Sequence, residues 1–347
     1  MPSSIRSLAI AALALCSGAT VGAVDFTWDI DFSSVFDNRE GDNAYTDTRT
    51  FFFTSLAPEI GLRFTPADRI AGGVVWNQPI GCQWDGHRIS PTLYYRHDGA
   101  ATSSPWSFSM GMFPRSELAE EMPGFLWSDS LSYTQRNIRG LLVQYRRERG
   151  FLDAYVDWRG MQTKTQREAF NIVVHGRWHP RRNNPFFIGG HAMMNHFALQ
   201  KDAPADQHIV DNFVVNPYIG VNMQGRTPLD SLIVRGGPLL TLERNRADGN
   251  NWKAPLGAWI EAVAEWRWLG LKNTFYAGGR QFPSYIPFRA DLYQGEPFFQ
   301  SRLYNRTDLY ARIYRNRYMD LRASLDFNIA GSSFIFYQRI LLRVYLP

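Results

Sequence analysis

The sequence predicts an all-β protein: a transmembrane, antiparallel, up-and-down β-barrel of about 16 strands, with 14 to 18 as the range. Three observations support this fold class. Apolar and charged residues alternate with a period of two, long connections alternate with short ones, and no run of roughly 20 apolar residues follows residue 24. The last observation excludes a helical membrane protein, whereas the alternation is typical of barrel strands.

The alternation is clearest in residues 319–330, "MDLRASLDFNIA", where Leu321 and Leu325 share one face and Arg322 and Asp326 share the other. Residues 257–270, "GAWIEAVAEWRWLG", are harder to interpret. Alanine, glutamate and leucine favour a helix, yet the apolar residues also fall on every second position. Because the neighbouring segments alternate in the same way, we interpret this segment as a strand.

The same reasoning, applied in order along the chain, predicts one strand for each alternating segment that is bounded by turn residues. The expected strands lie near 25–37, 50–65, 69–78, 88–97, 105–113, 137–148, 151–160, 167–179, 185–199, 209–224, 231–244, 254–268, 272–281, 305–315, 318–330 and 333–346.

The connections between these strands follow a parity rule. Every even-numbered link is a short turn, such as 149–150, and the odd-numbered links are generally longer, such as 114–136 and 282–304. The last link, 331–332, is the exception because it is odd-numbered and short. Outer-membrane barrels have short periplasmic turns and longer extracellular loops, and a soluble sandwich has no reason to keep this order.

Residues 1–23 have the features of a secretory signal: Arg6, an apolar run over 8–15 and small residues before position 24. We therefore expect one barrel domain over 24–347 in the bacterial outer membrane. Cys82 is then the single cysteine after the signal, so the domain is not a disulfide scaffold. The net charge of +5 is too small to indicate a nucleic-acid partner.

Composition supports a membrane location and a polar lumen. Aromatic residues make up 15% of the chain, as expected where Trp and Tyr lie at membrane interfaces. A charge at the midplane of the lipid-facing surface would cost roughly 2–4 kcal/mol. The charged faces of the predicted strands must therefore line a wet lumen.

A signal segment, about 16 alternating strands and ordered loops resemble the general porins of Gram-negative outer membranes. The phrases "GMFPRSELAEEMPGFLWSDSLSY", "LYQGEPFFQSRLYNRTDLYARIYRN" and "SFIFYQRILLRVYLP" also resemble a little-characterised group of outer-membrane barrels. The resemblance to porins implies that the third outer loop, 114–136, folds into the lumen and narrows it. Its carboxylates would then face arginines on the opposite wall, which would create a transverse field across the constriction.

This arrangement defines the candidate site, for which we expect no metal and no cofactor. The expected lining and constriction residues are Arg115, Glu117, Glu120, Glu121, Asp129, Arg177, Glu261, Glu265, Arg267, Arg312, Arg322, Asp326, Arg339 and Arg343. An alternative for the loop is a solvated surface turn capped by Ser116.

The sequence thus predicts a diffusion channel for small polar or anionic solutes, in contact with outer-membrane lipid and lipopolysaccharide. The alternative is a barrel-borne hydrolase acting on lipid or peptide at the cell surface, with a rim histidine or aspartate as its base and with a plugged lumen. No Ser–His or Asp–His spacing singles out a catalytic residue. The sequence does not determine the solute or the oligomeric state, and a homo-oligomer is one of the alternatives.

Overall fold

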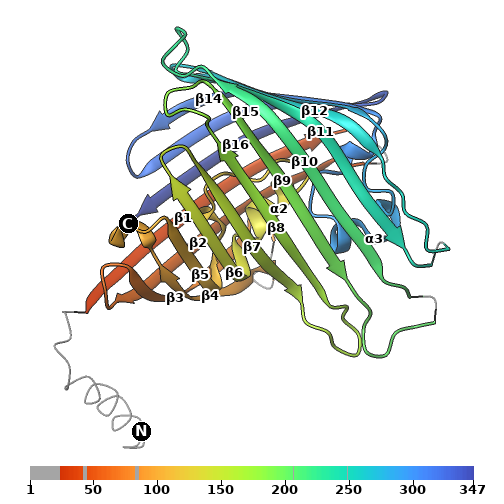
Figure 1. Ribbon diagram of the computed structural model, residues 1–347, viewed down its shortest axis with the longest axis horizontal. Coiled ribbons are helices and arrows are strands. Elements are labelled where there is room, and N and C mark those ends of the chain that lie inside the picture. The colour runs from red at the N-terminus through yellow and green to blue at the C-terminus, as the bar shows by residue number, and fades with distance from the viewer. Residues whose placement is uncertain (1–23, 42–44, 83–85, 206, 248) are drawn as a thin grey trace, which may run out of the picture.

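The computed structural model describes residues 24–347 except 42–44, 83–85, 206 and 248, so the predicted signal segment lies outside the described residues. The chain forms a closed antiparallel β-barrel of 16 strands, which confirms the predicted fold class. Figure 1 shows the tilted strands around an interior that holds the helix α2.

The strands agree with the predicted segments to within a few residues. They are β1 (Asp25–Glu40), β2 (Arg49–Arg63), β3 (Asp68–Pro79), β4 (Arg88–His97), β5 (Trp106–Pro114), β6 (Asn137–Arg147), β7 (Gly150–Gly160), β8 (Ala169–Trp178), β9 (Phe186–Phe197), β10 (Val210–Asn222), β11 (Ser231–Asn245), β12 (Leu256–Trp266), β13 (Leu269–Gly278), β14 (Leu303–Arg315), β15 (Met319–Ala330) and β16 (Ser333–Leu346).

The helical segments are short and lie in the connections. They are α2 (Asp129–Thr134), α3 (Tyr285–Leu292) and the 3-10 turns η2 (Gly99–Thr102), η3 (Arg115–Glu117) and η4 (Pro297–Gln300). Within the described residues, no helix has the length and apolar character needed to cross a bilayer.

The barrel closes between its first and last strands. β1 pairs antiparallel with β16 from Ile30 opposite Leu346 to Glu40 opposite Phe336. The start of β1 and the carboxyl terminus therefore lie at the same end of the barrel (Figure 1). This end also carries the short turns, and we refer to it as the periplasmic end.

The segment 257–270 is a strand hairpin, as its alternation predicted, and not a helix. β12 pairs with β13 from Gly257 opposite Gly278 to Trp266 opposite Leu269. The turn between them consists of Arg267 and Trp268, and not of residues 269–271 as the sequence indicated. Arg267 adopts a positive φ of 54°, which is typical of a tight turn position.

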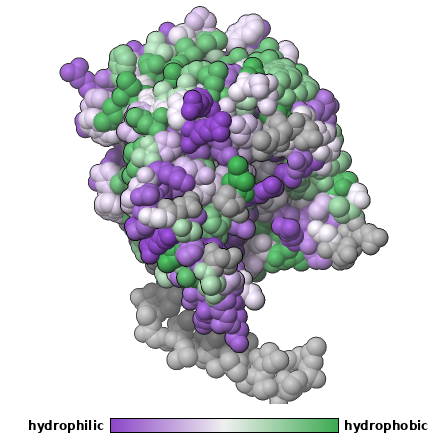
Figure 2. Space-filling view, turned by 90° about the vertical axis from the view of Figure 1, so that its right-hand side faces the viewer, coloured by the Kyte–Doolittle hydropathy of each residue, from purple (hydrophilic) through white to green (hydrophobic). Residues whose placement is uncertain are grey.

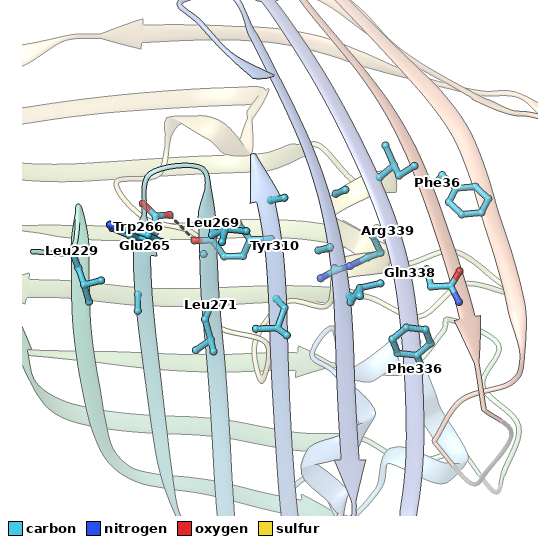
Figure 3. Close-up of a pocket in the computed structure, with 18 residues that line it drawn as sticks. Phe36, Leu229, Glu265, Trp266, Leu269, Leu271, Tyr310, Phe336, Gln338 and Arg339 are labelled. Carbon is cyan, nitrogen blue, oxygen red and sulfur yellow. Dashed lines mark hydrogen bonds between the residues drawn. The ribbon is translucent and has the colours of Figure 1, made fainter. Parts of the chain in front are cut away.

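The two faces of the strands separate polar from apolar residues. Around the β12–β13 hairpin, Glu265 accepts a hydrogen bond from Tyr310 Oη at 2.5 Å inside the barrel (Figure 3). Trp266 and Leu269 are exposed on the outer, lipid-facing wall. They border a hollow of about 880 Å³ on that wall, which reaches Phe336 and Gln338 on β16 (Figure 3).

Candidate functional site: a lumen closed by two loops

The third outer loop, residues 115–136, folds into the lumen. Near its start, Arg96 Nη1 on β4 donates a hydrogen bond to Glu117 Oε2 at 2.5 Å. Near its end, Asp129 Oδ2 lies 2.6 Å from both Arg306 Nη2 on β14 and Arg339 Nη1 on β16. Charged pairs therefore attach the loop to walls that are far apart around the barrel.

The middle of the third loop contacts a further part of the wall. Glu120 lies 2.8 Å from Arg177 on β8 and 3.3 Å from Arg235 on β11. Arg235 also pairs with Glu261 on β12 at 2.7 Å, and Lys272 on β13 lies 3.3 Å from the same carboxylate. The loop thus carries one carboxylate to each of three groups of basic residues on the wall.

The seventh outer loop, residues 279–302, also enters the lumen and meets the third loop there. The backbone N–H of Ser128 donates to the carbonyl oxygen of Gln294 at 2.7 Å, and that of Glu296 donates to Gly124 at 2.7 Å. The backbone N–H of Asp129 donates to Glu296 Oε1 at 2.8 Å. We refer to residues 115–136 and 279–302 together as the plug.

An aromatic cluster forms the centre of the plug. Phe125 of the third loop lies edge-on to Phe299 of the seventh loop and to Trp259 of β12, with ring centroids 5.8 and 5.5 Å apart. Phe298 stacks on Tyr304 of β14 at 5.3 Å. All five side chains are buried. An unplugged barrel of 16 strands leaves a water-filled lumen, and here this packing fills its centre between the two loops and the wall.

The two ends of the lumen differ in their access to water. In the extracellular half, Asp37 and Ile335 are 0% exposed and Tyr337 is 1% exposed. In the periplasmic half, the side chains of Arg343, Lys272 and Arg322 are 44%, 41% and 31% exposed to solvent. Partly exposed basic side chains therefore lie on the lumen wall at the periplasmic end, and we refer to this part of the lumen as the vestibule. The other end carries α3, and in Figure 2 it faces the viewer with hydrophilic patches between apolar ones.

Two carboxyl groups at the junction of the loops have opposite pKa shifts. Burial raises the pKa of Asp129, but the guanidinium groups of Arg306 and Arg339 outweigh it and hold this pKa below its ordinary value. Burial and the nearby charge of Asp129 raise the pKa of Glu296. The plug therefore favours ionisation of Asp129 and disfavours ionisation of Glu296, each relative to a free carboxyl group.

Most of the residues expected to line the lumen are inside the barrel, where they are paired. Arg115 pairs with Asp157 at 2.6 Å, Arg312 with Glu265 at 2.7 Å, Arg322 with Asp308 at 2.7 Å, Arg339 with Asp326 at 2.5 Å and Arg343 with Asp31 at 2.7 Å. Glu121 is exposed on the third loop.

Arg267 was expected on the lumen wall, and the structure corrects this placement. It lies in the β12–β13 turn, where its guanidinium is 5.1 Å from the ring centroid of Trp266, an outward-facing residue. The correction follows from the turn position. The strand ends two residues earlier than predicted, so the alternation of faces no longer applies to residue 267.

The sequence reasoning missed several members of the network. Lumen residues Arg96, Arg235, Arg306 and Asp308 were not singled out, although each follows the inward pattern of its strand. The inward fold of the seventh loop was also missed. A signal was present, because a loop rich in buried apolar residues such as Leu292, Tyr293, Phe298 and Phe299 is unusual on a surface.

The histidines form no metal centre. Among the described residues, no three His, Cys, Asp or Glu side chains are grouped so as to hold an ion.

His191 faces the lumen and contacts Phe125. His196 faces outward near the extracellular end, with its Nε2 3.7 Å from Glu168 Oε2. It belongs to a lateral row of strand partners, which runs Trp158, Phe170, His196, Asp211 and Arg244.

Solved structures similar to this fold include outer-membrane porins. The anion-selective porin from Comamonas acidovorans superimposes with a TM-score of 0.55 at 10% identity, covering 93% of this chain and 100% of that one. The outer membrane protein OprD from Pseudomonas aeruginosa gives a TM-score of 0.53 at 10% identity, covering 94% and 96%. The chain thus has the porin-like fold of a closed 16-stranded β-barrel.

Sequence comparison assigns the family. The profile of the lipid A 3'-O-deacylase-type family matches residues 22–341, so the chain belongs to that family. No curated protein matches the sequence.

Proposed function

We propose that this protein is a gated outer-membrane channel for small polar solutes, with a preference for anions. The observation that carries the proposal is the charged vestibule, which ends at a plug made of two loops. The loops contact one another mainly through a few backbone hydrogen bonds and the aromatic cluster. Such a junction is small compared with the barrel wall, so it is the part of the lumen that can open without unfolding the barrel.

The preference for anions follows from which charges meet water. Three basic side chains of the vestibule, Arg343, Lys272 and Arg322, are partly exposed, and each pairs with a carboxylate. The acidic partners of these residues are less exposed to solvent; for example, the side chain of Asp308 is only 5% exposed. A vestibule with exposed guanidinium groups raises the local concentration of anions.

The test is electrical recording in planar bilayers, together with uptake of sugars and amino acids by proteoliposomes. The proposal predicts discrete openings and a reversal potential that indicates anion preference in a salt gradient. Absence of conductance at every voltage and pH, with no uptake of solute, would refute it.

A second candidate function is hydrolysis of an acyl ester at the membrane surface, which family membership favours. His196 and Glu168 support it, because they lie on the lipid-facing wall near the extracellular end. His196 would take a proton from water, and the resulting hydroxide would attack the ester carbonyl. The acyl–oxygen bond breaks, and the alkoxide receives the proton to leave an alcohol and a fatty acid.

This candidate has its own test. Lipid A from cells that produce the protein would lose one ester-linked acyl chain, measured by mass spectrometry, and His196→Gln would restore the full set. His97→Gln is the matched control, since His97 pairs with Asp68 near the periplasmic end. Unchanged lipid A in cells with wild-type protein would eliminate the hydrolase.

A further inference from the structure

A second hollow lies on the lipid-facing wall of β6–β10, outside the lumen and away from the plug. Its volume is about 960 Å³, within the range of roughly 300–1,000 Å³ for small-molecule sites. Small outward residues form its floor: Gly176 on β8, and Gly190 and Ala192 on β9. Leu152, Trp178 and Ile188, which surround the floor, are exposed large apolar residues.

The hollow results from the register of strands β8, β9 and β10. Gly176 is paired directly with Gly190, and Gly190 with Pro217 on β10, so three adjacent strands lack a long side chain at the same level. A hollow with these apolar walls, facing the hydrocarbon of a bilayer, is unsuited to water and is filled by an acyl chain.

The periplasmic margin of the hollow is basic. Arg147 and Arg149 belong to its lining and are exposed, and among the described residues neither has an ion-pair partner. Arg149 lies 4.9 Å from the ring centroid of Trp178, which places its guanidinium beside the apolar wall. The one carboxylate between them, Glu148, pairs with Arg182 at 3.4 Å. The margin therefore has a surplus of positive charge.

Aromatic residues mark this margin as the membrane interface. Tyr145, which also lines the hollow, packs edge-on against Trp106 with ring centroids 4.8 Å apart. Rings of this type lie at the level of lipid headgroups. The arginines thus lie at the depth of the phosphates, and the hollow extends from there into the hydrocarbon.

We infer that this surface binds an anionic glycerophospholipid of the periplasmic leaflet, with an acyl chain in the hollow and the phosphodiester on Arg147 and Arg149. Charge complementarity selects the phosphate, and the missing side chains of Gly176 and Gly190 accommodate the chain. A second copy of the protein related by two-fold symmetry would bring the same hollow to this surface. Two hollows would then face each other, and neither would be filled.

Two variants test the site from its two ends. Gly190→Leu fills the hollow, and a Cβ there would lie 3.5 Å from its nearest neighbour, Asn216 O, so the backbone tolerates it. Arg147→Gln combined with Arg149→Gln removes the charge. The matched controls are Gly72→Leu, an outward glycine on β3 whose Cβ would lie 3.6 Å from Leu93, and Arg63→Gln combined with Arg317→Gln.

The measurement is native mass spectrometry of the detergent-solubilised protein titrated with phosphatidylglycerol, and in a second arm with phosphatidylethanolamine. Electrophoretic mobility before and after heating reports that each variant is folded. We expect one phosphatidylglycerol per barrel, bound more tightly than phosphatidylethanolamine. Both test variants should weaken its binding at least about tenfold, and both controls should leave it unchanged.

Three results would overturn the inference. They are equal binding by the folded test variants and controls, no preference for the anionic lipid, or a dimer of the wild-type protein that Gly190→Leu disrupts. None of these results depends on conductance, so the inference stands or falls separately from the proposed channel.

Discussion

The backbone N–H of Ser128 donates a hydrogen bond to the carbonyl oxygen of Gln294 at 2.7 Å, which joins the third and seventh outer loops inside the barrel. The two residues are 166 positions apart in the chain, and neither belongs to the wall. Their contact joins the two loops across a lumen that 16 strands would otherwise leave open. This junction is the gate of the proposed channel.

Asp129→Asn should open the plug. The carboxylate pairs with Arg306 and Arg339, and its loss removes charge-assisted hydrogen bonds worth roughly 1.5–3 kcal/mol. The open probability in planar bilayers should rise about tenfold or more. Glu121→Gln is the matched control, because it removes the same charge from an exposed position of the same loop. An equal effect of both variants would mean that net charge, and not the pairing, controls opening.

Phe125→Ala should also favour the open lumen, by a different route. Phe125 is 1% exposed and contacts rings from the wall and from the seventh loop. Its truncation leaves a cavity and typically costs about 3–5 kcal/mol. Conductance should rise, and proteolysis within the third loop should become faster. Phe186→Ala, at an outward phenylalanine that is 63% exposed, should change neither.

Opening should depend on pH through Glu296. Burial and the charge of Asp129 raise the pKa of Glu296, so its contribution to the plug is complete below its unfolded value of about 4.3 and is lost as pH rises through the raised pKa. Asp129 has a lowered pKa, so its contribution is lost only in stronger acid. Open probability should therefore increase as pH rises from about 4.3.

Glu296→Gln is the variant for this measurement. It keeps the oxygen that accepts the N–H of Asp129 and cannot ionise, so the plug should stay closed across the same pH range. If the variant showed the wild-type pH profile, another group would be the sensor.

The combination Arg322→Gln and Arg343→Gln should reduce the preference for anions. Both arginines are among the exposed basic residues of the vestibule. The reversal potential in a salt gradient should shift toward that of a nonselective pore. Arg181→Gln with Arg317→Gln removes the same charge from exposed turn positions, and it should leave the reversal potential unchanged. A shift of equal size in the control would make the selectivity a property of net charge.

The sequence was sufficient to predict the wall, because a period of two is imposed locally by each strand. It predicted that Glu117, Glu120 and Asp129 would face arginines, and these residues do form pairs inside the barrel. Arg267 was misplaced because successive residues of a strand point to opposite faces. A small error in the position of a strand end therefore changes the face that is expected for a residue beyond it.

The inward fold of the third loop was expected from the resemblance to porins, but the part of the seventh loop in the plug could not be predicted. Its contacts, such as Gln294 with Asn171 and the carbonyl of Leu292 with Asn195, join distant segments that have no regular period. Only the apolar content of the seventh loop indicated that it does not lie on the surface.

The most direct test of the gate is a paired bilayer recording of the wild type and of a variant whose residues 282–300 are replaced by a short Gly-Ser linker. We predict steady conductance in the variant, and brief openings in the wild type that become more frequent as pH rises. A variant that conducts beside a wild type that never opens, at any voltage or pH, would show that the plug is permanent and would contradict the channel account.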